Sequence, residues 1–133
     1  MNKTETAILE QILKIPANEW RFNGYEYNDT QYQPSITTKV GLNTFDIEYS
    51  FREDRRYVSI YGYFPESSDR AYIAGFDMNS KGFGKDFTNL ITAVGEYCNK
   101  QKAEAERKKA ESESRSKNLD SILSGLNKKN LSK

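Results

Sequence analysis

The chain has 133 residues, of which 36% are hydrophobic and 29% charged, and its formal net charge is +1. This length allows one domain with a single core. The single cysteine excludes an internal disulfide framework and suits a reducing compartment. No stretch approaches the roughly 20 apolar residues of a membrane span, and the N-terminus lacks the apolar run of a signal peptide. We therefore expect a cytoplasmic protein that makes no membrane contact.

The near-neutral total hides a division of charge along the chain. Residues 1–99 carry 10 Lys/Arg and 14 Asp/Glu, a net charge of −4, whereas residues 100–133 carry 10 Lys/Arg and 5 Asp/Glu, a net charge of +5. Such an asymmetry is typical of an interacting tail, although a tail whose charges only keep it solvated would look the same.

The first predicted element is a helix capped by Thr4 and stopped by Pro16. Its apolar residues recur at helical spacing and form one face, made of Ile8, Leu9, Ile12 and Leu13.

From Trp20 to Asp77 the hydrophobic period changes to two, which is typical of strands. Residues 45–51 and 58–64 alternate cleanly, and a turn at residues 53 and 54 predicts a hairpin with Ile47 opposite Ile60 and Tyr49 opposite Val58. Further strands are expected at 36–42 and 71–76, and a weaker one at 20–27, interrupted at 23–24. The register of the strand at 71–76 stays open, because either of two sets could face inward: Tyr72 with Phe76, or Ala71 with Ile73.

A second, longer helix is expected after residue 86, with Asp86 as its cap. Its apolar positions follow helical spacing: Phe87, Leu90, Ile91, Val94, Tyr97 and Cys98. The predicted fold class is therefore α+β. It consists of an N-terminal helix, an antiparallel meander of four to five strands, and a long C-terminal helix packed on the same sheet face.

Composition changes sharply after residue 100, which divides the chain into three predicted parts: an α+β domain at 1–100, a charged helix-prone spacer at 101–118 and a short amphipathic terminal motif at 119–133. The spacer has no apolar stripe and is expected to be helical or flexible. The terminal motif restores helical apolar spacing with Leu119, Ile122, Leu123 and Leu126. Two turns do not hold a helix in water. These residues therefore dock on a partner, fold back on the protein itself, pair with a second copy, or are disordered.

Enzyme catalysis has little support in the sequence. The chain has no histidine, which removes the usual nucleophile arrangements and the usual neutral metal ligand. Cys98 lies on the apolar stripe of the second helix and is expected to be a small core residue. Asp46 and Glu48 share one sheet face, but a spacing of two on a strand is common and implies no third polar partner. No catalytic residue, metal or cofactor is predicted.

Binding another protein is the favoured function, as an adaptor, inhibitor or assembly component. Tyrosines on the outer sheet face, Tyr57, Tyr61 and Tyr63, would offer contact area with few torsions to freeze. The terminal motif would reach a second site on the partner. The Lys-, Asn- and Tyr-rich composition without histidine suits a small accessory protein of a bacterium or phage.

Binding of single-stranded nucleic acid is the alternative. It would use basic residues at the tip of the central hairpin and in the tail, namely Arg52, Arg55, Arg56, Lys108 and Lys109, with the outer tyrosines stacking on bases. The acidic residues beside those tyrosines weaken this alternative, because phosphate attraction supplies most non-specific affinity.

Overall fold

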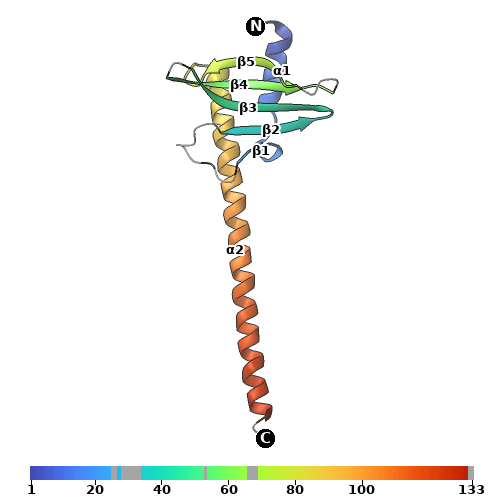
Figure 1. Cartoon of the computed structure of the whole chain (residues 1–133), viewed down its shortest axis with the longest axis vertical. Coiled ribbons are helices and arrows are strands. Elements are labelled where there is room, and N and C mark those ends of the chain that lie inside the picture. The colour runs from blue at the N-terminus through green and yellow to red at the C-terminus, as the bar shows by residue number, and fades with distance from the viewer. Residues whose placement is uncertain (25–26, 28–33, 53, 66–68, 132–133) are drawn as a thin grey trace. The chain divides into compact units, whose positions relative to one another are not determined.

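The computed structural model describes residues 1–24, 27, 34–52, 54–65 and 69–131 (Figure 1). The chain divides into two compact units, Met1–Asn99 and Lys100–Lys133. None of the helices in the described part of the chain has the uninterrupted apolar length that crossing a lipid bilayer requires.

The first helix, α1, spans Lys3–Leu13. Its cap is Asn2, whose side-chain oxygen accepts from the backbone N–H of Glu5 at 2.8 Å, so the predicted cap at Thr4 is wrong by two residues. The Asn2 amide also donates to the Glu5 carboxylate at 2.9 Å, which gives the first turn a reciprocal pair of hydrogen bonds. A short 3₁₀ helix, η1 (Ala17–Glu19), follows the turn at Pro16.

Five antiparallel strands form one sheet in the sequential order β1-β2-β3-β4-β5, which confirms the predicted meander. The strands are β1 (Arg21–Phe22), β2 (Ser35–Val40), β3 (Asn43–Arg52), β4 (Arg55–Tyr63) and β5 (Ala71–Asp77). The weak strand expected at 20–27 is reduced to the two residues of β1, and residues 25 and 26 lie outside the described residues.

The predicted register of the central hairpin is correct. Ile47 pairs with Ile60 and Tyr49 with Val58, and all four side chains are buried, with exposures between 0% and 4%. Asp54 in the turn has φ +63°, a left-handed conformation that Asp tolerates better than most residues. This register decides which side chains of the hairpin face the core.

A register shift between Ile60 and Tyr61 determines which residues of β5 face the core. Before the shift Ile60 pairs with Ala74, and after it Tyr61 pairs with Tyr72. Ala74 is buried at 8% exposure, whereas Tyr72 is 60% exposed. Neither predicted inward set continues along the whole strand. At the irregularity the alternation of inward-facing and outward-facing residues shifts by one residue.

The second helix, α2, spans Phe83–Leu131, so the spacer and the described part of the terminal motif, as far as Leu131, continue it as helix. Asp86 lies inside its first turn and is not the cap, although a carboxylate there still favours the helix dipole. Within the first unit α2 buries Phe87, Ile91 and Val94 at 0–1% exposure.

The core lies between the two helices and one face of the sheet. Buried residues of α1, α2 and the strands form one cluster, and Figure 1 shows α1 and the first turns of α2 on the same side of the sheet. This confirms the predicted packing of both helices on one face. No helix among the described residues of the first unit covers the other face, which we call the open sheet face, and the candidate surfaces begin there.

Candidate interaction surfaces

The open sheet face carries the tyrosines that the sequence predicted for it. Tyr57, Tyr61 and Tyr63 alternate along β4 on the side away from the core, and each is half-buried. Tyr72 joins them from β5 and is more exposed, at 60%. The sequence left Tyr72 unassigned, because its facing depends on the register shift in β5.

A guanidinium covers one of these tyrosines. Arg70, just before β5, donates two hydrogen bonds to the carboxylate of Glu48, each 3.0 Å long. Its guanidinium carbon also lies 3.8 Å from the centroid of the Tyr61 ring. The hydrogen bonds to Glu48 are the main cause that raises the pKa of Arg70 above its ordinary value. The ring of Tyr72 meets that of Tyr61 edge to face, with centroids 5.8 Å apart.

A row of polar side chains continues this face toward the other edge of the sheet. The hydroxyl of Thr37 donates to Asp46 at 2.7 Å, and the amide of Asn23 donates to the hydroxyls of Thr37 and Ser35 at 2.6 and 3.2 Å. Asp46 and Glu48 are thus held by different partners, Thr37 and Arg70. Each carboxylate is therefore bound to its own partner, and the two are not arranged so that one would activate the other.

The basic side chains that the structure describes on the central hairpin, Arg55 and Arg56, do not form a patch of one sign. The backbone of Arg52 is the strand partner of Arg55, and its side chain lies outside the described part of the chain. A depression of about 500 Å³ beside Arg55 and Arg56 is also lined by acids, Asp54 and Asp77. The two tail lysines of the predicted basic set, Lys108 and Lys109, are exposed on α2 in the second unit.

The apolar residues of the terminal motif form a stripe on the helical tail. Four side chains define this C-terminal stripe, with exposures of 55% to 59%: Leu119, Ile122, Leu123 and Leu126. The helical spacing places Ser121 and Ser124 on the opposite face of the same turns. The described part of the second unit, residues 100–131, is a single helix, so no other element of that unit covers the stripe.

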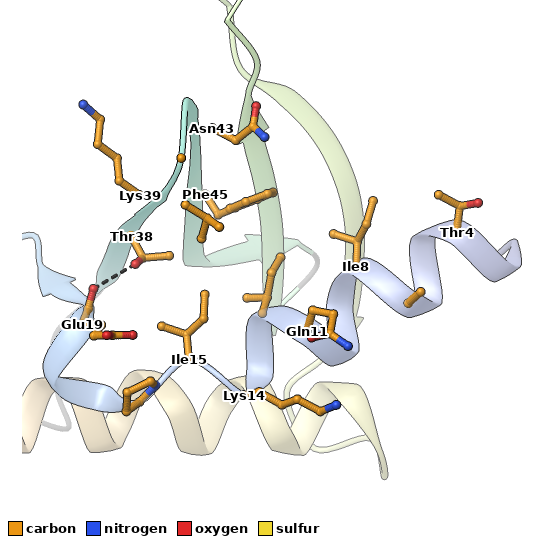
Figure 2. Close-up of a pocket in the computed structure, with 15 residues that line it drawn as sticks. Thr4, Ile8, Gln11, Lys14, Ile15, Glu19, Thr38, Lys39, Asn43 and Phe45 are labelled. Carbon is orange, nitrogen blue, oxygen red and sulfur yellow. Dashed lines mark hydrogen bonds between the residues drawn. The ribbon is translucent and has the colours of Figure 1, made fainter.

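An apolar groove in the first unit was not predicted from the sequence. It lies between α1 and the β2–β3 hairpin, has a volume of about 1070 Å³, and is shown in Figure 2. Its apolar walls come from Ile8, Ile12, Ile15, Val40 and Phe45. Polar side chains line the same groove: Thr4, Gln11, Lys14, Glu19, Lys39 and Asn43. We call it the α1 groove.

A tertiary hydrogen bond closes one end of the α1 groove. The hydroxyl of Thr38 on β2 donates to the backbone carbonyl of Glu19 at 2.8 Å (Figure 2). This bond ties the segment after α1 to the strand that forms the opposite wall. The two walls, which are far apart in the sequence, are therefore fixed to one another within the first unit.

Sites for metal or thiol chemistry are not apparent in the described part of the chain. The residues that the structure describes include no group of three or more potential metal ligands. Cys98 is a free, half-buried thiol that packs against the core cluster. No protein-family model matches the chain, and comparisons with curated proteins and with solved structures found no match.

Proposed function

We propose that this protein is a non-enzymatic protein-binding module, acting as an adaptor, inhibitor or assembly component. The observation that carries the proposal is the C-terminal stripe, whose four aliphatic side chains are more than half exposed on one side of a helix. A stripe of this kind gains stability only when another surface removes it from water. Placing one face of an amphipathic helix in an apolar groove is a common way in which proteins recognise each other.

The open sheet face is the second surface of the proposed module. It combines aromatic side chains with hydrogen-bonded polar groups, which is the composition of many interface cores. The Glu48–Arg70 pair and the Arg70–Tyr61 stack hold this part of the face in one arrangement before any partner arrives. A pre-arranged surface loses less side-chain entropy on binding. Tyr72 is 60% exposed, more than the neighbouring residues Glu48, Arg70 and Tyr61, and would be the first to contact a partner.

Nucleic-acid binding is supported less well. The face of Tyr61 that would stack on a base is covered by the Arg70 guanidinium at 3.8 Å. Its cross-strand neighbour is Asp46, and Glu48 lies two residues further along β3. A labelled oligonucleotide titrated at low and moderate salt separates the alternatives, since phosphate contacts weaken steeply with salt. Binding that is tight at low salt and lost at moderate salt would favour the nucleic-acid function.

Paired substitutions that introduce charge into the full chain test the proposed function. Leu119→Lys/Leu123→Lys places two charges on the stripe, and the matched control Ser121→Lys/Ser124→Lys places the same two charges on the opposite face. Proteins from an extract of the source cells are captured on the immobilised wild type and on each variant. We expect a partner that the wild type and the control retain, and that the stripe variant binds about 10- to 100-fold more weakly. Equal recovery on all three would contradict the role of the stripe.

A further inference from the structure

We infer that the C-terminal stripe of one copy docks in the α1 groove of a second copy. This inference rests on the proposed function, because it identifies a partner for the stripe. The groove belongs to the first unit and the stripe to the second. The contact that we propose is between two molecules, each of which offers both surfaces.

The stripe is poorly suited to pairing with its own counterpart. A coiled coil needs apolar residues at alternating steps of three and four over about three to four heptads. Stepping back from Leu119 in this way reaches Arg115, Ser112 and Lys108, all polar and exposed. The apolar seam therefore lasts only two turns. A stripe this short needs a pre-formed apolar surface of a different shape, not a copy of itself.

The α1 groove has the properties of such a surface. Its volume of about 1070 Å³ lies slightly above the roughly 300–1,000 Å³ typical of small-molecule pockets. Thr4, Ala7 and Gln11 on one wall are exposed, so the groove is open along α1. Val40 on the other wall is 48% exposed. An open apolar groove along a helix suits a segment of protein chain better than a small molecule, which binds in a more enclosed pocket.

Charge favours this occupant over an unrelated apolar helix. The unit that contains the groove has 10 Lys/Arg and 14 Asp/Glu, and the unit that contains the stripe has 10 Lys/Arg and 5 Asp/Glu, giving net charges of −4 and +5. Opposite net charges on the first unit of one copy and the second unit of another favour the approach of these two units and raise the rate of association. Near the contact lysines outnumber acids on both sides, with Lys14, Lys39 and Glu19 at the groove and Lys117, Asp120, Lys128 and Lys129 beside the stripe, so the attraction comes from the units as wholes.

The first measurement is the mass of the full chain as a function of concentration, by light scattering or sedimentation. We expect the mass to rise from 15.3 kDa toward at least twice that value. Leu123→Lys on the stripe and Ala7→Lys in the groove should each weaken association by about 10- to 100-fold. The matched controls add the same charge elsewhere on exposed helix, Ser124→Lys opposite the stripe and Asn89→Lys outside the groove, and should associate as the wild type does.

Mixing the two defective variants identifies which surfaces meet. A molecule with Leu123→Lys keeps an intact groove, and a molecule with Ala7→Lys keeps an intact stripe. An equimolar mixture should therefore form a dimer at concentrations where each variant alone stays monomeric. If stripe met stripe, Ala7→Lys would associate alone as the wild type does, which would overturn the proposal. Far-UV circular dichroism checks each fold, and Val40→Lys replaces Ala7→Lys if that variant unfolds.

The result separates this inference from the proposed function. A wild-type mass of 15.3 kDa at every concentration overturns docking between copies. If the stripe variant nevertheless loses a captured partner in the cell-extract experiment, the stripe binds another protein and the proposed function stands. If neither experiment responds to the stripe variants, both proposals fail.

Discussion

The side-chain amide of Asn99 forms two hydrogen bonds with the backbone of Tyr27. Its oxygen accepts from the Tyr27 N–H at 3.0 Å, and its nitrogen donates to the Tyr27 carbonyl at 2.7 Å. Tyr27 is 9% exposed and packs edge to face on Phe22, with ring centroids 5.7 Å apart. The last residue of the first unit is therefore hydrogen-bonded to Tyr27, which lies 72 positions earlier in the chain.

Removing the Asn99 amide should destabilise the first unit. Asn99→Ala leaves the N–H and C=O of Tyr27 without these partners, and unsatisfied buried groups cost about 1–3 kcal/mol. We expect the midpoint of urea unfolding to fall accordingly. Asn89→Ala, at an exposed position of the same helix, is the control and should change stability by less than about 0.5 kcal/mol. Similar midpoints for both variants would show that the amide is unimportant.

Two helical glycines of α2 should respond in opposite ways to alanine. A Cβ atom at Gly95 would overlap the ring of Tyr27, whereas Gly125 has no described atom within 4 Å of its added Cβ. Gly95→Ala should therefore destabilise the first unit by about 1–3 kcal/mol through overpacking. Gly125→Ala should stabilise the helical tail by up to about 1 kcal/mol. Urea unfolding measures the first effect and helical circular dichroism the second, and a stabilising Gly95→Ala would contradict the packing.

The sequence predicts the central hairpin because two independent signals agree there. Alternation assigns Ile47 and Ile60 to one face, and the polar turn between the strands sets which residues are opposite. The register shift after Ile60 has no comparable signal, because it arises from the pairing of β4 with β5. The cap of α1 does have a local signal, because Asn2 is followed three residues later by Glu5.

The candidate surfaces were predictable only where one element carries them. The C-terminal stripe lies on one helix, so its spacing is visible in the sequence. Arg70 follows Asp69 just before a strand, and nothing local indicates its contacts with Glu48 and Tyr61. The α1 groove depends on how α1 packs beside the β2–β3 hairpin, which is a tertiary property. Local patterns therefore missed both.

The Glu48–Arg70 pair should contribute modestly to stability. The Arg70 side chain is 38% exposed, so solvent screens the interaction despite its two hydrogen bonds. A double-mutant cycle with Glu48→Gln and Arg70→Gln should give a coupling of about 0.2–1 kcal/mol. The control cycle pairs Arg70→Gln with Asp46→Asn, whose carboxylate is held by Thr37, and should give a smaller coupling. Equal couplings in the two cycles would contradict a specific Glu48–Arg70 interaction.

Alkaline pH should weaken the fold through Tyr49. Burial is the main cause that raises the pKa of this phenol above 10.0, helped by Tyr27 and opposed by Thr92, Arg56 and Thr88. Below pH 10 both folded and unfolded chains keep the proton, so the full stability is present. As the pH rises above about 10, the unfolded chain loses it first, and the free energy of unfolding falls.

The variant that tests this is Tyr49→Phe, which keeps the buried ring and removes the titrating hydroxyl. We expect its free energy of unfolding to fall less than that of the wild type when urea unfolding is compared at pH 8 and pH values above about 10. At neutral pH the lost hydroxyl contacts should cost about 1 kcal/mol. Tyr72→Phe, which removes a hydroxyl from a side chain 60% exposed on the open face, is the matched control. If Tyr49→Phe loses as much stability at high pH as the wild type, the alkaline weakening arises elsewhere in the chain.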